Sequence, residues 1–166
     1  TSLALDGEGN PHISYQHATN EDLKVAWLSG ATWLSETVDG QGRVGRYSSL
    51  ALDSAGRPRI SYYDATNGDL KYARLSGNTW VSETVDGAGS AGQHTSLALD
   101  GDDRPHISYR GANGLAYARW DGASWVTETV DDAPGAGQYT SLALDSEGAP
   151  HIAHCVGGED AVRLAW

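Results

Sequence analysis

The sequence TSLALD at Thr1–Asp6 decides the fold, because close copies of it return three times along the chain. The copies lie at Ser48–Asp53, Thr95–Asp100 and Thr140–Asp145, so successive copies start 47, 47 and 45 residues apart. A sequence period of about 20–50 residues indicates an array, a solenoid or a propeller. We therefore divide the chain into repeats at residues 1–47, 48–94, 95–139 and 140–166. Residues that recur in every repeat are expected to be structural, so functional residues are sought where the repeats differ.

The second repeat is the clearest guide to the structure of one unit. Residues 49–53 and 59–63 alternate between apolar and small or polar side chains, which predicts two strands joined by a turn that contains Gly56 and Pro58. Residues 70–75 and 79–85 predict two further strands, and the last of them is rich in β-branched and aromatic residues. Each unit is thus expected to be four short antiparallel strands.

Four-stranded units of this length are typical of β-propeller blades, which pack face to face around a central channel. We predict a single all-β domain at residues 1–166, a β-propeller with three complete blades and a fourth that lacks its outer strand. The first strand of each blade is expected to be innermost. The fourth, which carries Trp33, Trp80 or Trp125, is expected at the rim. A β-solenoid is the main alternative, but its coils usually repeat at shorter periods.

One string in the repeats is similar to known propeller sequences. It reads Leu-Asp-x-x-Gly-x-Pro-His-Ile-Ser-Tyr at Leu5–Tyr15, with a close copy at Leu99–Tyr109 and a shorter one at Leu144–Ile152. It resembles the repeats of bacterial β-propeller proteins of the sialidase-like (Asp-box) and lectin-like types. The resemblance covers the whole chain and implies the propeller architecture more specifically than it implies an activity.

The fourth repeat is shorter than the others, because its third strand is predicted at residues 161–166 and no fourth strand follows in the sequence. The chain could close alone as a four-bladed ring, two chains could combine into a ring of about eight blades, or the chain could be a piece of a longer propeller. A third strand at the edge of a sheet would be exposed, which proteins normally avoid. We therefore favour a homo-oligomer that completes a ring, or a longer chain.

The acidic composition argues against two classes of partner. The chain of 166 residues has a net charge of −11, with 11 Lys and Arg against 22 Asp and Glu. Nucleic acids and anionic membranes require clustered cations, and no apolar run is long enough for a membrane span. We expect no nucleic-acid binding and no membrane insertion. The single cysteine, Cys155, excludes an intramolecular disulfide.

Several recurring residues suggest catalysis or metal binding, but their recurrence favours structural roles. Each complete repeat has a Trp-x-x-Glu segment, whereas glycoside hydrolysis needs two carboxylates in one site. The aspartate that ends each LALD sequence is expected to bind the amides of the following turn. His12, His106 and His151 share one repeat position, with Arg59 in the remaining copy, so they lie on different blades. We predict no catalytic residue, no metal site, no cofactor and no enzyme activity.

The loops remain as the candidate site. Two sets are expected on one face: the links between repeats at residues 40–47, 87–94 and 132–139, and the links between second and third strands at residues 16–22, 64–69, 110–114 and 155–160. They combine rings, amides and carboxylates, a mixture that suits sugar recognition. The predicted ligand-binding residues are Arg46, Tyr47, Gln93, His94, Gln138, Tyr139, Asp64 and Asn67. The alternative for Tyr47, His94 and Tyr139 is packing between blades, because they also recur.

We predict a non-enzymatic, lectin-like module that binds glycans through several equivalent weak sites and is secreted from the cell. The first alternative is a scaffold for protein–protein contacts, as one portion of a larger propeller. The second is a degenerate relative of the sialidase-like glycoside hydrolases.

Overall fold

The computed structural model describes residues 1–158 and 162–165, and this part of the chain is built from β-strands joined by turns. It contains no helix that could span a membrane. The first sheet consists of β1 (Ser2–Leu5), β2 (Pro11–Gln16), β3 (Leu23–Ser29) and β4 (Thr32–Asp39). The second consists of β5 (Val44–Leu52), β6 (Pro58–Asp64), β7 (Asp69–Ser76) and β8 (Thr79–Asp86). The third consists of β9 (Gln93–Leu99), β10 (Pro105–Gly111), β11 (Gly114–Trp120) and β12 (Trp125–Asp131), and the fourth of β13 (Gln138–Leu144), β14 (Pro150–Cys155) and β15 (Val162–Ala165).

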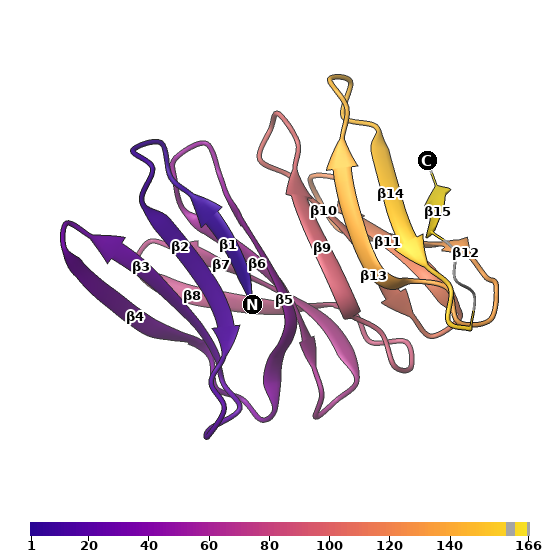
Figure 1. Ribbon diagram of the computed structural model, residues 1–166, viewed down its shortest axis with the longest axis horizontal. Coiled ribbons are helices and arrows are strands. Elements are labelled where there is room, and N and C mark those ends of the chain that lie inside the picture. The colour runs from indigo at the N-terminus through magenta and orange to yellow at the C-terminus, as the bar shows by residue number, and fades with distance from the viewer. Residues whose placement is uncertain (159–161, 166) are drawn as a thin grey trace.

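Within every sheet the strands are antiparallel and lie in sequence order, as in the blades of a propeller. This confirms the predicted fold class, with three complete blades and a fourth of three strands in the described part. Figure 1 shows the four sheets following one another from the indigo sheet at the N-terminus to the yellow strands near the C-terminus. Of the strand predicted at 161–166, residues 161 and 166 lie outside the described part, as do residues 159–160 of the last predicted loop.

Three hydrophobic cores hold the sheets together, one between each pair of neighbours. The core between the second and third sheets contains Leu70 and Tyr72 on one side and Ile107 and Tyr109 on the other, all nearly inaccessible to solvent. The innermost strands β1, β5, β9 and β13 contact one another in that order. Because both faces of a middle sheet are covered, its strands are apolar on both sides, which explains their imperfect alternation in the sequence.

The innermost strands of the last three sheets begin earlier than the sequence predicts. Arg46–Tyr47, Gln93–His94 and Gln138–Tyr139 were predicted to end loops, but they belong to β5, β9 and β13. Irregular register in these strands marks bulges, which the alternation pattern does not reveal. Gly92, directly before β9, is required by a close approach between sheets, since a Cβ there would lie 2.6 Å from the Cα of Leu70 in the preceding sheet.

The aspartates that end the LALD sequences hold the turns, as predicted. Asp53 accepts hydrogen bonds from the backbone amides of Ala55 and Arg57 at 3.0 and 2.8 Å. The same pattern recurs at Asp6, Asp100 and Asp145. Bonds from backbone amides favour the carboxylate form and are among the causes that lower the pKa of each of these aspartates.

Candidate functional site

The two predicted sets of loops do lie on one face of the sheets. In the link from the first to the second sheet, the Arg43 amide donates to the Thr66 hydroxyl at 2.7 Å, and the Arg43 carbonyl accepts from the Ala65 amide at 2.8 Å. Thr66 and Ala65 belong to the loop between β6 and β7. The relation between the loop sets that was expected from propeller connectivity is therefore confirmed.

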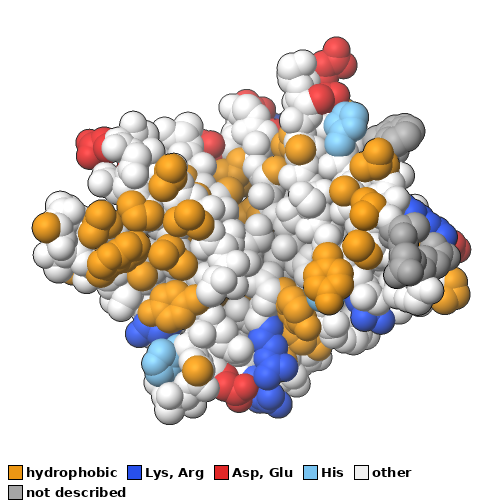
Figure 2. Space-filling model, in the orientation of Figure 1, with side chains coloured by type: hydrophobic (Ala, Val, Ile, Leu, Met, Phe, Trp, Pro, Cys, Tyr) orange, Lys and Arg blue, Asp and Glu red, His pale blue; other side chains and the backbone are white. Residues whose placement is uncertain are grey.

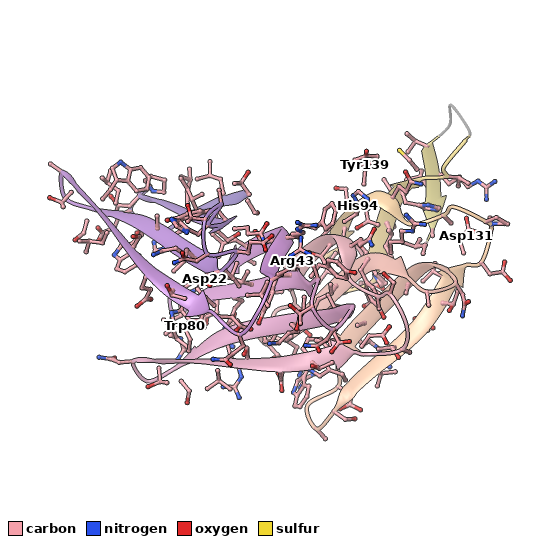
Figure 3. The ribbon with its side chains drawn as sticks, turned by 90° about the horizontal axis from the view of Figure 1, so that it is seen from below. Asp22, Arg43, Trp80, His94, Asp131 and Tyr139 are labelled. Carbon is pink, nitrogen blue, oxygen red and sulfur yellow. The ribbon has the colours of Figure 1, made fainter. Side chains whose placement is uncertain are left out.

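Tyr47, His94 and Tyr139 form a row of rings across the innermost strands. The ring centroids of Tyr47 and His94 are 4.5 Å apart, and those of His94 and Tyr139 are 4.6 Å apart. Figure 3 shows His94 and Tyr139 as neighbours. All three residues have positive φ, between 51° and 55°, a conformation that costs a non-glycine residue about 1–3 kcal/mol. The contacts between rings of successive sheets agree with the packing alternative, while Tyr47 and Tyr139 keep exposed surface.

The other predicted residues bond to neighbouring residues on the same face of the protein. Arg46 forms an ion pair with Glu21 at 3.4 Å. The Gln93 and Gln138 side-chain amides donate within their own loops, to the Ser90 hydroxyl and the Gly135 carbonyl. Asp64 is buried and accepts from the backbone amide of Thr66, and Asn67 donates to its second oxygen. These bonds assign Asp64 and Asn67 a role in shaping the loop.

A hollow of about 580 Å³ opens on the same face, between the β10–β11 loop of the third sheet and the link from β12 to β13. Its charged and amide side chains come from Arg110, Asn113 and Asp132, and most of its other lining residues are glycine and alanine. Aromatic side chains are absent from its lining among the described residues. It therefore offers polar groups without the flat apolar surface that a sugar ring would cover.

A second cleft combines both kinds of surface, and it lies between the second and third sheets, at the end where β5 turns into β6 and β9 turns into β10. Its volume is about 420 Å³, within the range of about 300–1,000 Å³ that is usual for small-ligand sites. Its lining residues include three aromatic side chains and charged residues of both signs. They are Arg57, Arg59, Tyr72, Arg74, Glu83, Asp102, Asp103, Arg104, Pro105, Trp120 and Trp125.

The partly exposed rings of Trp120 and Trp125 make the apolar part of this cleft, and the buried ring of Tyr72 lies behind them. Trp125 lies edge-on to Tyr72, with ring centroids 5.3 Å apart, and edge-on to Trp120 at 5.7 Å. Such edge-to-face pairs fix ring positions by their quadrupoles as well as by burial. Tyr72 comes from the second sheet and both tryptophans from the third, so the cleft depends on the stacking of two sheets.

The polar groups of the cleft fall into a fixed set and an available set. The Arg59 guanidinium is held by Asp53, with Nη2 at 2.9 Å from Oδ2, and also donates to the Tyr72 hydroxyl at 3.4 Å. In contrast, Arg74 and Glu83 make no side-chain hydrogen bond or ion pair with any other described residue. One cation with several donors and one carboxylate with several acceptor positions are thus available to a ligand.

Glu36, the residue equivalent to Glu83 in the interface between the first and second sheets, already has a hydrogen-bond partner. There the Trp80 indole N–H donates to the Glu36 carboxylate at 2.8 Å. In the cleft, the buried Nε1 of Trp125 has no hydrogen-bond partner in the described part of the chain, so Glu83 is not bound in this way. The predicted structural role of the Trp–Glu repeat is therefore confirmed for Glu36 and Trp80. Trp125 also has a structural role, because it packs on the core between the second and third sheets, but it does not bond Glu83.

Asp103 fixes the two sheets together at the cleft. It accepts from the Ser54 amide at 2.8 Å and from the Ser54 hydroxyl at 2.5 Å. Asp103 has a φ of 60° and occupies the position of Gly9 and Gly56 in the other repeats. The positive φ is unfavourable for an aspartate, but the Asp103 carboxylate makes a bond between sheets that glycine could not make.

Sequence reasoning missed this cleft, although a signal was present. Trp120 stands where the first two repeats have Leu28 and Leu75, and Arg59 stands where the other three have histidine. Both are departures from the repeat, which is where functional residues are expected. What the sequence could not give is that side chains from Arg59 and Trp120, in different sheets, line one cleft.

The histidines of the repeat lie on different sheets, as predicted, and each pairs with the aspartate of its own turn. The distances from His Nε2 to Asp Oδ2 are 3.7, 3.6 and 3.5 Å for His12, His106 and His151. In the second sheet Arg59 replaces histidine and pairs with Asp53. Residues 1–158 and 162–165 contain no group of three or more ligating side chains that could hold a metal ion.

The fold is similar to those of several solved carbohydrate-related proteins. A fucose lectin from Kordia zhangzhouensis, in complex with methyl-fucoside, has a TM-score of 0.51 and 23% identity, over 76% of this chain and 96% of that one. The Aleuria aurantia lectin, with Fucα1-6GlcNAc, has a TM-score of 0.56 and 16% identity, over 98% of this chain and 59% of that one. A xylan β-1,4-xylosidase from Bacillus halodurans has a TM-score of 0.52 and 14% identity, over 92% and 36%.

No protein-family model matches the sequence, and no curated protein matches it either. The chain spans little more than half the length of the Aleuria lectin and about a third of the xylosidase. At these identities the similarity shows the fold alone. Together with the sheet topology, it identifies the chain as a set of β-propeller blades, in accord with the resemblance drawn from the repeats.

Proposed function

We propose that this protein is a non-catalytic carbohydrate-binding module that binds a neutral sugar in the cleft between the second and third sheets. The observation that carries the proposal is the meeting of the partly exposed rings of Trp120 and Trp125, backed by the buried ring of Tyr72, with the unbound side chains of Arg74 and Glu83. A sugar needs both: a flat apolar surface for its C–H face, and fixed polar groups for its hydroxyls.

Arg74 and Glu83 complement each other toward a pair of hydroxyl groups. The guanidinium donates to two hydroxyl oxygens, and the carboxylate accepts from their protons, so a neutral ligand leaves neither charge unmatched. Arg59 keeps its ion pair with Asp53, which fixes this lining residue of the cleft in place. The fucose-binding lectins among the similar structures support a sugar as the ligand class, and fucose is therefore the first sugar to test.

The proposal differs from the sequence prediction in the face of the propeller that it uses. The predicted loop residues lie at the other end of the strands, where Asp64 and Asn67 shape a loop and the rings of Tyr47, His94 and Tyr139 pack on one another. That face remains a prediction, and variants at Tyr47 and Tyr139 test it in the same assay.

The carboxylates of the cleft support the proposal of binding without hydrolysis. Retaining and inverting hydrolysis both use two carboxyl groups. Asp103 is bound by Ser54, and Asp102 pairs with Arg104 at 3.3 Å, while Glu83 makes no such bond with other described residues. We therefore propose that the xylosidase-like fold is not accompanied by glycosidase activity here. Release of 4-nitrophenol from a panel of nitrophenyl glycosides by the purified protein would contradict this part of the proposal.

The test is calorimetric titration of the purified protein with fucose, galactose and glucose, after a glycan array that widens the panel. The Arg74→Ala variant is expected to lose at least tenfold in affinity for the bound sugar. Arg119→Ala is the matched control, because Arg119 occupies the same repeat position in the third sheet and does not line the cleft. Equal losses in both variants, or no glycan signal at all, would reject the cleft and favour a protein-binding scaffold.

A further inference from the structure

The interface between neighbouring sheets repeats one hydrogen bond at the innermost strands. The Leu50 amide donates to the Ser2 hydroxyl, the Leu97 amide to Ser49, and the Leu142 amide to Ser96, each at 3.0 Å. In each case the serine belongs to one sheet and the leucine to the next. This bond therefore defines the register in which each sheet of this protein docks on the one before it.

Continuing the series leaves one serine and one leucine at opposite ends of the arrangement. Ser141 is the corresponding serine of the fourth sheet, and its exposed hydroxyl makes no hydrogen bond with the described residues. Leu3 is the corresponding leucine of the first sheet. Figure 1 places the two sheets at the two ends of the row.

The outer face of the first sheet has apolar residues at repeat positions that are covered in the other sheets, but no sheet of the described chain covers it. Leu3 is 61% exposed, whereas Leu50, Leu97 and Leu142 are 6–9% exposed at the same repeat position. Leu5 on the same strand and Trp33 on β4 of the same sheet are also exposed. Figure 2 shows hydrophobic side chains gathered over this sheet at the left of the view. A shallow hollow of about 500 Å³ lies on this sheet, lined by residues that include Ile13, Tyr15 and Trp33.

The outer face of the fourth sheet shows the complementary pattern. Leu164 is 68% exposed, while Val25, Tyr72 and Tyr117 at the same repeat position are 1–4% exposed because the following sheet covers them. Val162 is 69% exposed, and its equivalents Leu23, Leu70 and Leu115 are fully buried. Covering these two aliphatic side chains with another apolar face is favourable, because it removes apolar surface from water.

We propose that the outer face of the fourth sheet docks on the open face of the first sheet of a second copy of this chain, with Leu3 N–H donating to Ser141. A second copy of the chain is the expected partner, because three interfaces within one chain already join the same two kinds of face. The two faces differ, so the contact is head-to-tail, and two copies with two such contacts close a ring with twofold symmetry. The ring presents two sugar-binding clefts, which adds avidity toward a multivalent glycan.

The test is the molar mass in solution, by light scattering after size exclusion, over a hundredfold range of concentration. The expected mass is twice that of the 17.5 kDa chain. Leu3→Asp and Leu164→Asp should each yield monomers with an unchanged circular dichroism spectrum. Val126→Asp is the control, since Val126 is a partly exposed aliphatic residue of a middle sheet, and it should remain dimeric.

Mixing the two monomeric variants distinguishes the head-to-tail contact from a symmetric one. A mixed pair has one contact with both native faces and one with both altered faces, so it should regain part of the dimer mass. A folded monomer at all concentrations for the unaltered chain would overturn the proposal. So would a dimer that Leu164→Asp leaves intact, because it would use the first sheet alone.

Discussion

The indole N–H of Trp80 bonds the carboxylate of Glu36 across the first interface between sheets, at 2.8 Å. The equivalent residues of the next interface, Trp125 and Glu83, line the proposed site without this bond. The same pair of residue types is thus used in one interface to join two sheets and in the next to leave a carboxylate available. The divergence of one repeat from another is what gives the protein a candidate site.

Removing the two glutamates separately should separate stability from binding. Glu36→Ala is expected to lower the free energy of unfolding by about 1 kcal/mol, the usual contribution of such a hydrogen bond, and to leave sugar affinity unchanged. Glu83→Ala should leave stability within about 0.5 kcal/mol and weaken sugar binding at least tenfold, about 1.4 kcal/mol. Urea unfolding and calorimetric titration measure the two effects. If Glu36→Ala reduced the affinity as much as Glu83→Ala, the assignment of roles would be wrong.

Gly92 is expected to be among the positions least tolerant of substitution. An added Cβ would meet the backbone of Leu70 at 2.6 Å, and the φ of 104° disfavours a side chain in any case. Gly92→Ala should lower the free energy of unfolding by about 3 kcal/mol or more. Gly101→Ala is the matched control, because its Cβ would meet nothing within 4 Å, and it should change stability by less than about 0.5 kcal/mol. Similar unfolding midpoints for the two variants would contradict the close approach between Gly92 and Leu70.

The buried cluster of Asp39, Lys71 and Tyr62 should make stability depend on acid pH. Asp39 accepts from the Lys71 ammonium and the Tyr62 hydroxyl, both at 2.6 Å. Burial by itself raises the pKa of a carboxyl, but these hydrogen bonds and the Lys71 charge outweigh it, so the pKa of Asp39 lies below its ordinary value. The stabilisation is complete above the unfolded-state pKa of about 4 and is lost as pH falls through the lower folded-state pKa.

Asp39→Asn measures this contribution. At pH 7 the variant should be less stable by about 3 kcal/mol, since it leaves the Lys71 ammonium unpaired in a largely buried position. The difference from the unaltered protein should shrink as pH is lowered from 5 to 2. Asp132→Asn, at an exposed position, should show a small difference at every pH. A difference that stayed constant down to pH 2 would contradict the lowered pKa.

The sequence was sufficient for the fold and for the structural roles of several repeated residues, although Glu83 departs from the role predicted for it. Four copies of one pattern predicted four units of antiparallel strands, and Asp53 and Trp80 behave as repeated, structural residues should. It was insufficient for the bulges, because Tyr47 and His94 adopt a backbone conformation that no alternation pattern encodes. It was also insufficient for the cleft, which forms only when Tyr72 and Trp120 of different sheets are brought together by stacking.

The most direct test of the central claim is a ¹⁵N–¹H NMR titration that follows the tryptophan indole signals while fucose is added. If the sugar binds in the cleft, the Trp120 and Trp125 signals should shift with a common saturation curve, while those of Trp33 and Trp80 stay in place. Trp120→Leu restores the residue type of the other repeats and should abolish the shift of Trp125. Shifts confined to the backbone amides of Tyr47, His94 and Tyr139 would place the sugar on the opposite face and contradict binding in the cleft.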